Sequence, residues 1–458
     1  MKSHQSTTDD SEGKALAFLA AACAPRGAGH GTGTLDGAEA IRAAHPEVAR
    51  SSIHAASVVG DDEAVRDFLA GDPAQATATG GPYEWDPLTY LCFSRYLRLD
   101  PARSDAFVRA ATALLDAGAS PNSGWFEEEH QPHPEWESVL YGAAGVAHHA
   151  PLTRLLLERG ADPNDGEVVY HAPETRDNEA LRILVESGRL TTASLTTILL
   201  RKTDWHDLEA VRWLLARGVD PNQRTQWGHT AIHGAIRSDN MLEIIELLVE
   251  HGADPWITAN GMSAVALAAR RGRRDVLELF DRRGIPTELS GVDRLIAACA
   301  RADGALVSVL AAQEPRLARE LLAEGGTIIA QFASTGNAAG IEQLLALGVP
   351  VDERFREGSG YHSIAPHSTA LHVAAWKAWH ETVRFLVARG ADVGARNARG
   401  ETPLMLAVRA CVDSYWTVHR APDSVASLLA AGASPAEAPY PCGYADVDRL
   451  LRQYGAGT

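Results

Sequence analysis

The chain has 458 residues, of which 42 are Lys or Arg and 59 are Asp or Glu, so its formal net charge is −17. A general nucleic-acid binder needs a basic surface that neutralises phosphates, and this acidic balance disfavours that class. With 45% hydrophobic and 22% charged residues, and no apolar run long enough to span a bilayer, the composition predicts a folded protein without a transmembrane helix.

The first segment of the chain is polar and acidic, and we expect residues 1–13 to form a disordered tail. Apolar residues then recur with helical spacing between 14 and 50, which predicts an N-terminal helical cap. No basic stretch is followed by an apolar one, as a secretory signal requires, and none of the five cysteines forms a C-x-x-C pair. The expected location is the cytoplasm, with reduced cysteines.

From residue 51 to residue 435 one phrase recurs about every 33 residues. The phrase opens with Thr or Ser, an apolar residue and Leu, continues with two small residues, and closes with Leu-Leu-x-x-Gly-Ala/Val-Asp, and several copies match it only in part. The clearest copies lie at residues 230–255 and 369–392. Each copy predicts two short helices, the second ending at a glycine that can adopt a left-handed conformation.

This phrase resembles the ankyrin repeat, whose T-P-L-H-x-A-A and L-L-x-x-G-A-D-x-N motifs are matched by Thr402-Pro403-Leu404 and by Leu156 to Asn164. The resemblance implies an all-α repeat solenoid of about eleven helix-turn-helix units, joined by β-hairpin-like loops and curved with a concave face. Residues 436–458 would then form a C-terminal cap helix and tail. The chain also looks like a group of bacterial ankyrin proteins with an extra N-terminal helical region, for which no activity is established.

Three histidines, His54, His233 and His372, occupy the fourth position of the repeat. The resemblance implies that each hydrogen-bonds the backbone of a neighbouring hairpin. We therefore interpret them as structural residues and not as ligands.

Three stretches are longer than the repeat requires: residues 123–136, 354–368 and 411–420. Insertions in a repeat stack fall on surface loops, and extended hairpins are suited to partner contact. Whether the first two insertions bind anything stays open at the level of the sequence.

In ankyrin proteins partner contacts come mainly from the hairpins and from the end of the first helix of each unit. Carried over to this chain, and with the aromatic residues of the first insertion added, these positions give one set of predicted partner-binding residues. They are Tyr83, Trp85, Phe93, Trp125, Phe126, Trp136, Trp205, Trp227, His229, Arg237, Arg270, Arg271, Arg301, Trp376 and Lys377.

The basic members of this set all belong to the C-terminal half of the chain, which predicts a strip of Arg and Lys interleaved with exposed Trp. Such a strip favours an acidic protein or peptide as the partner. The alternative interpretation of residues 270–274, Arg-Arg-Gly-Arg-Arg, is a solvated turn between two helices. We expect a monomer that binds neither nucleic acid nor membrane.

No P-loop, nucleophile elbow, zinc-protease motif or calcium loop is present, so the sequence predicts no catalytic residue, no cofactor and no metal. The leading hypothesis is a scaffold or adaptor that binds a partner protein in the concave groove. Two alternatives remain: the neutralising partner of a toxin or effector, and an enzyme or metal-dependent activity. The second could use Glu129, His130 and His133 in the first insertion, or acid–base groups near Glu174 and Asp204.

Overall fold

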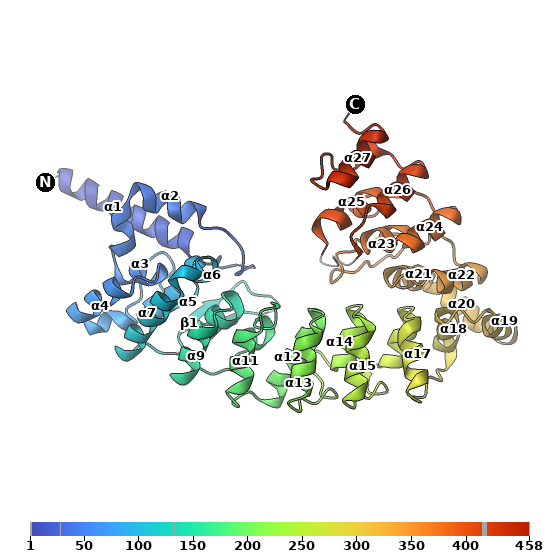
Figure 1. Ribbon diagram of the computed structural model, residues 1–458, viewed down its shortest axis with the longest axis horizontal. Coiled ribbons are helices and arrows are strands. Elements are labelled where there is room, and N and C mark those ends of the chain that lie inside the picture. Colours follow the sequence, from blue (N-terminus) through green and yellow to red (C-terminus); the bar gives the residue numbers. More distant parts are fainter. Residues whose placement is uncertain (1, 28, 132, 415–418, 458) are drawn as a thin grey trace. The chain divides into compact units, whose positions relative to one another are not determined.

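The computed structural model describes residues 2–27, 29–131, 133–414 and 419–457, with side chains from residue 12 onward. Its contacts divide into unit 1 (Met1–Ala231) and unit 2 (Ile232–Thr458). Within each unit, short helices follow one another as stacked pairs (Figure 1). No helix formed by the described residues has both the length and the apolar character needed to cross a membrane.

Unit 1 contains thirteen α-helices, one two-stranded sheet and short helical turns among its described residues. The α-helices are α1 (Lys2–Ala22), α2 (Asp36–Ala44), α3 (Ile53–Val58), α4 (Asp62–Gly71), α5 (Pro87–Cys92), α6 (Arg95–Leu99), α7 (Ser104–Asp116), α8 (Val139–Tyr141), α9 (Ala150–Glu158), α10 (Gly166–His171), α11 (Glu179–Glu186), α12 (Thr192–Asp204) and α13 (Leu208–Leu215). The other elements are β1 (Gly124–Glu127), β2 (Glu135–Ser138), η1 (Pro46–Arg50), η2 (Pro73–Thr77), η3 (Pro101–Arg103) and the π-helical η4 (Gly142–Val146).

Unit 2 continues the pattern from α14, which begins at the last residue of unit 1. Its helices are α14 (Ala231–Arg237), α15 (Leu242–Glu250), α16 (Ala264–Arg270), α17 (Arg274–Arg282), α18 (Gly291–Ala300), α19 (Gly304–Gln313), α20 (Pro315–Ala323), α21 (Gly325–Ser334), α22 (Ala338–Ala346), α23 (Ala370–Trp376), α24 (His380–Ala388), α25 (Pro403–Asp413), α26 (Asp423–Ala430) and α27 (Ala445–Gln453). The remaining elements are β3 (Thr258–Ala259), β4 (Met262–Ser263) and η6 (Pro435–Glu437).

Local sequence explains where these helices begin and end. A side-chain oxygen caps the first helix of several repeats: Ser52 accepts from Ala55 N, Asp86 from Thr89 N and Ser138 from Tyr141 N. Such a cap satisfies one of the backbone donors that a helix leaves unpaired at its start. Gly160 follows α9 with φ +99°, a conformation that favours glycine and ends the helix.

Stacking of successive repeats builds the core of unit 1. The first helices contact one another in the order α3, α5, α8, α10, α12, and the second helices in the order α4, α7, α9, α11 (Figure 1). Small residues such as Ala55 and Ala56 are fully buried where first helices meet. The mostly helical repeat fold is therefore confirmed, whereas the curvature, the concave face and the count of about eleven units stay predictions.

The N-terminal segment packs against the early repeats of unit 1. Residues 2–13, for which the sequence predicts a disordered tail, lie within α1, because the helix formed by the apolar residues around Phe18 and Leu19 continues without a proline toward Lys2. Beyond α1, Ala24 N donates to Phe93 O at 2.8 Å, and Arg98 donates to Gly33 O at 2.8 Å. The loop between α1 and α2 is thereby fixed on the second repeat.

The first insertion forms the hairpin of β1 and β2. Its register pairs Trp125 with Glu137 and Phe126 with Trp136. Because side chains alternate between the two faces of a strand, Trp125, Glu127 and Glu137 point to one face and Phe126 and Trp136 to the other. The first face is buried and the second is exposed.

In unit 2 the second insertion folds back on itself through backbone bridges between Phe355 and Ser368 and between Ser359 and Ile364. The third insertion, residues 411–420, lies partly outside the described residues, since 415–418 are not described. Helix α27 contacts α26 and buries Val447 and Leu451, within the segment predicted as the C-terminal cap.

Candidate functional site

Four of the predicted partner-binding residues in unit 1 have exposed aromatic rings: Phe126, Trp136, Trp205 and Trp227. Phe126 is 51% exposed and Trp136 is 44% exposed, and they are direct cross-strand partners on the outer face of the β1–β2 hairpin. Trp227 contacts the ring of Tyr170 edge to face, with 5.6 Å between the ring centroids. We refer to Phe126 and Trp136 as the aromatic pair.

Three other aromatic residues predicted to contact a partner, Trp85, Phe93 and Trp125, are instead buried. Their rings pack together, with centroids 5.2 Å apart for Trp85–Trp125 and 5.9 Å for Phe93–Trp125. The loop after α1 covers this cluster, and Tyr83 lies beside it, half-buried against Trp85. The N-terminal segment therefore covers these three rings, which the sequence predicts as partner contacts.

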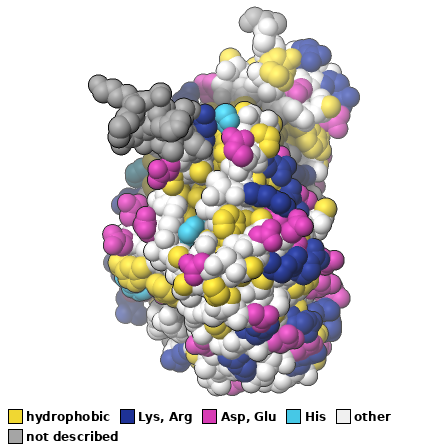
Figure 2. Space-filling model, turned by 90° about the vertical axis from the view of Figure 1, so that its left-hand side faces the viewer, with side chains coloured by type: hydrophobic (Ala, Val, Ile, Leu, Met, Phe, Trp, Pro, Cys, Tyr) yellow, Lys and Arg dark blue, Asp and Glu magenta, His cyan; other side chains and the backbone are white. Residues whose placement is uncertain are grey.

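The predicted basic strip of unit 2 consists of ion-paired side chains. Arg270 contacts Asp293 at 2.6 Å and Glu324 at 2.8 Å, and Arg301 contacts Asp281 at 2.9 Å. In unit 1, too, basic and acidic side chains are interspersed on the face that Figure 2 shows. The solvated-turn interpretation of residues 270–274 is also incomplete, since Arg271 and Arg273 are buried while Arg274 is exposed.

A buried charge cluster accounts for Arg271 and Lys377. Asp239, just after α14, pairs with Arg271 and with Lys377, the latter at 3.0 Å, and it accepts a hydrogen bond from Ser334 at 3.0 Å. His362 Nε2 lies 3.5 Å from the same carboxylate. Burial alone would raise the pKa of Asp239, but the Arg271 and Lys377 charges hold it far below its usual value. These side chains come from five segments of unit 2, and the cluster buries the charges of Arg271 and Lys377.

The second insertion covers the end of α23. Trp376 is buried, and its Nε1 donates to the carbonyl oxygen of His362 at 2.7 Å. Arg237 lies over the exposed ring of Tyr361, 4.9 Å from its centroid. The predicted exposure of Trp376 and Lys377 is wrong, because residues of this insertion occupy the surface above them.

The structural interpretation of the repeat histidines is confirmed. The Nε2 atoms of His54, His233 and His372 lie 2.8, 3.2 and 3.0 Å from backbone carbonyl oxygens of residues 78, 262 and 401. His229, which is not one of these repeat histidines, is half-buried and lies two residues after Trp227.

The carboxylates of the predicted acid–base site form ion pairs with neighbouring cations. Glu174 contacts both Arg201 and His171, and Asp204 contacts Arg201 at 2.7 Å. Asp207 pairs with the buried ammonium of Lys202 at 3.1 Å. Each carboxylate already has a cation beside it, so none is poised as a free base.

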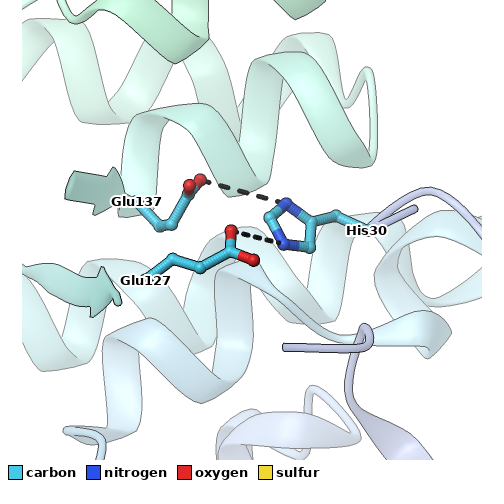
Figure 3. A group of neighbouring side chains, drawn as sticks. All are labelled: His30, Glu127 and Glu137. Carbon is cyan, nitrogen blue, oxygen red and sulfur yellow. Dashed lines mark ion pairs between the residues drawn. The ribbon is translucent and has the colours of Figure 1, made fainter. Parts of the chain in front are cut away.

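A separate group of titratable residues lies behind the buried face of the hairpin. His30, from the loop after α1, faces Glu127 of β1 and Glu137 of β2 (Figure 3). Its Nε2 lies 3.3 Å from Glu127 Oε2, and its Nδ1 lies 3.9 Å from Glu137 Oε2. The Tyr141 hydroxyl is 2.8 Å from Nδ1. We call His30, Glu127 and Glu137 the hairpin–cap cluster.

A second triad shares Glu137 with this cluster. One ligand atom each from His130, Glu137 and Glu167 lie within 4.8 Å of one another, and the same limit holds for His30, Glu127 and Glu137. His130 thus approaches two buried or half-buried carboxylates, whereas Glu129 and His133 are exposed and His133 contacts Glu135 at 3.6 Å. The sequence does not predict this cluster, because the register that places Glu127 and Glu137 on the inner face of the hairpin cannot be read from it.

The carboxylates of several glutamates shift the pKa values of residues in and beside the cluster. Burial, together with Glu167 and Glu127, raises the pKa of Glu137 to about 9. Burial also lowers the pKa of His30, because the low-dielectric interior disfavours its charged form. Burial acts likewise on His171, but hydrogen bonds to Glu167 and Glu174 prevail and raise its pKa to about 9.

Comparison with known families now decides the nature of the repeat. A family profile described as ankyrin repeats (3 copies) matches residues 198–286, and one described as ankyrin repeats (many copies) matches residues 371–413. The chain contains ankyrin repeats. The number of ankyrin repeats beyond these two segments, and a bacterial origin, stay predictions.

Several proteins with ankyrin repeats are similar to parts of the chain. An ankyrin repeat protein of fowlpox virus (strain NVSL), FPV219, is 30% identical over 116 residues, which are 24% of this chain and 26% of the viral protein. The ankyrin repeat domain of human ASB11 shares 21% identity, covering 51% of this chain and 96% of that domain, with a TM-score of 0.23. The ankyrin repeat domain of Bcl-3 shares 22% identity, covering 50% of this chain and 97% of that domain, with a TM-score of 0.21.

Proposed function

We propose that the chain is a protein-binding module and that the aromatic pair, Phe126 and Trp136, is part of its contact surface. Ankyrin repeats in general act as protein–protein interaction modules, which supports the general role. The observation that carries the specific proposal is the exposure of two large rings side by side on an extended hairpin.

Exposed aromatic rings on a rigid element are suited to binding. Burying a ring of this size in an interface contributes a large apolar area, and few rotatable bonds must be ordered. The aromatic pair belongs to β1 and β2, whose opposite face is anchored by the buried ring of Trp125. The strands therefore hold both rings in place before a partner arrives, which lowers the entropic cost of association.

Trp205 and Trp227 extend the proposed surface along unit 1. Trp205 caps the end of α12, and Trp227 lies in the hairpin before α14. Arg201 lies 4.0 Å from the centroid of Tyr170, and Tyr170 in turn supports Trp227. We assign these rings, with the aromatic pair, to partner contact.

The structure gives less support to the prediction that the partner is acidic. An acidic partner is the prediction from the basic residues of unit 2, but those side chains already have acidic neighbours in the chain. An acidic partner would have to exchange the partly exposed ion pairs of Arg270 and Arg301, which changes the free energy little, whereas the pairs of Arg271 and Lys377 are buried. We therefore propose apolar and aromatic complementarity, not charge, as the main determinant of recognition.

The test is capture of a partner followed by a binding measurement with purified components. The full chain serves as bait in the native cell extract, next to the double variant Phe126→Ser/Trp136→Ser. A matched control, Val309→Ser/Leu322→Ser, removes two exposed apolar side chains from helices instead of the hairpin. A partner retained by the wild type and the control, but lost with the hairpin variant, supports the proposal.

For the captured protein, we expect the hairpin variant to raise Kd at least about 30-fold, which corresponds to one strong hot spot. The control variant should change Kd less than about threefold. Equal binding by all three proteins would exclude the aromatic pair from the contact surface.

A further inference from the structure

The hairpin–cap cluster brings together segments that are far apart in the chain. His30 follows α1, whereas Glu127 and Glu137 end β1 and lie in β2. All three side chains are buried, and Glu137 is 0% exposed. Rings of Phe93, Trp125 and Tyr141 surround His30 at centroid distances of 5.7 to 6.4 Å.

The polar atoms of the cluster lack well-formed hydrogen bonds, although His30 Nε2 and Glu127 Oε2 lie 3.3 Å apart. Both carboxylate oxygens of Glu137, Oε2 of Glu127 and Nε2 of His30 are buried without a hydrogen bond from any described residue. A buried polar group left in this state costs about 1–3 kcal/mol, and more when it is charged. A native core contains few such atoms, so four of them facing one point indicate a missing component.

Two kinds of component would satisfy these atoms. One is a proton shared by the two carboxylates, which satisfies two oxygens and leaves the imidazole nitrogen as it is. The other is a cation, which accepts electron pairs from both carboxylates and the imidazole at once. The presence of the imidazole among the ligand atoms favours the cation.

We propose that His30, Glu127 and Glu137 bind one divalent transition-metal ion of the kind that accepts mixed nitrogen and oxygen ligands, such as Zn²⁺. One ligand atom from each residue already lies within 4.8 Å of the others. Ligands that bind zinc at about 2.0–2.2 Å are about 3.4 Å apart in a tetrahedral site, so shifts of about an ångström close the geometry.

The surroundings fit such a site. The Tyr141 hydroxyl engages Nδ1 of His30, so Nε2, which lies 3.3 Å from Glu127 Oε2, is the nitrogen left for the metal. The Glu137 carboxylate, which lies 3.9 Å from Nδ1, would turn toward Nε2 when the ion binds. One ligand atom each from His130 and Glu167 lie within 4.8 Å of one from Glu137, so either residue could supply a further ligand. Oxygen and imidazole ligands suit Zn²⁺, whereas an all-oxygen set would suit Ca²⁺ or Mg²⁺.

The consequence of binding would be structural. The ion would join the loop after α1 to both strands of the hairpin that carries the aromatic pair. Binding would therefore stabilise the packing of the N-terminal cap on the repeats and hold the hairpin in one orientation.

The experiment is titration of the full chain, previously freed of metal with a chelator, with ZnCl₂ in a calorimeter. The wild type should bind one ion per chain at the cluster. Glu137→Gln keeps the volume of the side chain and should weaken Zn²⁺ binding more than about 100-fold. This loss exceeds the roughly 10–100-fold expected when a residue that only hydrogen-bonds a metal ligand is replaced. Tyr141→Phe removes such a hydrogen bond and should weaken binding by about 10–100-fold.

The matched control is Glu129→Gln/His133→Gln, which removes two potential ligands of the same hairpin that are exposed. This control should bind Zn²⁺ as the wild type does, and circular dichroism should show that all variants are folded. Hydrogen exchange gives a second measurement: Zn²⁺ should slow exchange of residues 23–35 in the wild type and not in Glu137→Gln.

Three results would overturn the proposal. The first is no binding of Zn²⁺ or Mn²⁺ by the wild type, which would leave the shared proton as the occupant. The second is unchanged binding by His30→Gln, which would move the site to His130 and Glu167. The third is loss of binding in the control variant only, which would place the site on the exposed loop.

Discussion

Asp239→Asn should destabilise unit 2 strongly, because it leaves two buried cations without their counter-charge. The side chains of Arg271 and Lys377 are 7% and 6% exposed, and both contact this carboxylate. Asn has the same shape as Asp, and it is among the residues that best tolerate the positive φ of 57° at this position. The substitution therefore changes the charge and little else.

The expected cost follows from the burial of the pair. Removing one partner of a buried ion pair costs about 3–5 kcal/mol, because the remaining charge stays desolvated. For a unit the size of Ile232–Thr458, each kcal/mol lowers Tm by about 2–4 °C, so Asp239→Asn should lower the Tm of unit 2 by about 6–20 °C. The exposed pair of Arg274 and Glu278 supplies the control, since Glu278→Gln should cost less than about 0.5 kcal/mol.

The assay is urea unfolding combined with hydrogen exchange, which locates the loss of stability in unit 2. Because the pKa of Asp239 in the folded chain lies below its unfolded value, its contribution is complete above about pH 4 and is lost as the pH falls further. The difference between wild type and Asp239→Asn should therefore shrink below pH 4. A difference under 1 kcal/mol at pH 7, or one that does not change with pH, would refute the reasoning.

Two further predictions concern single residues of unit 2. Burial lowers the pKa of His372 to about 4, and its Nδ1 accepts a hydrogen bond from Thr369 N while Nε2 donates to Glu401 O, so the folded chain holds the neutral ring. The contribution of this residue to the free energy of unfolding is complete above about pH 6.5 and is lost toward pH 4. In urea unfolding over this interval, the wild type should therefore lose about 3 kcal/mol more than His372→Gln. Parallel pH profiles of the two proteins would contradict this. Gly272→Ala should destabilise unit 2 by more than Gly252→Ala, because both glycines have positive φ but only the new Cβ at 272 would lie 2.6 Å from a phenylalanine ring. Equal midpoints of the two alanine variants in chemical unfolding would show that the ring moves aside.

The local part of the structure could be predicted from the sequence. The recurring phrase specifies two helices per repeat through its apolar spacing, and the fourth-position histidines, such as His54, bind backbone as expected. These features depend on residues within one repeat or its neighbour. The length of the first insertion, which exceeds that of the repeat, also predicts an extended hairpin, and β1 and β2 form one.

The interactions between remote segments could not be predicted in this way. Asp239 meets Lys377 across several repeats, and His30 meets Glu137 only because the loop after α1 folds over the second repeat. The burial of Trp125 depends on the register of the hairpin, since a shift by one residue would bury Phe126 instead. The sequence pattern does not indicate the buried cluster, because Glu137 is buried and Trp136 exposed, the reverse of the usual alternation in a strand.

The most direct test of the proposed binding surface is hydrogen exchange of the full chain with and without its purified partner. We predict that the partner slows exchange in residues 124–127 and 135–138, the two strands that carry Phe126 and Trp136. Protection confined to unit 2, with the hairpin exchanging as in the free chain, would contradict this account.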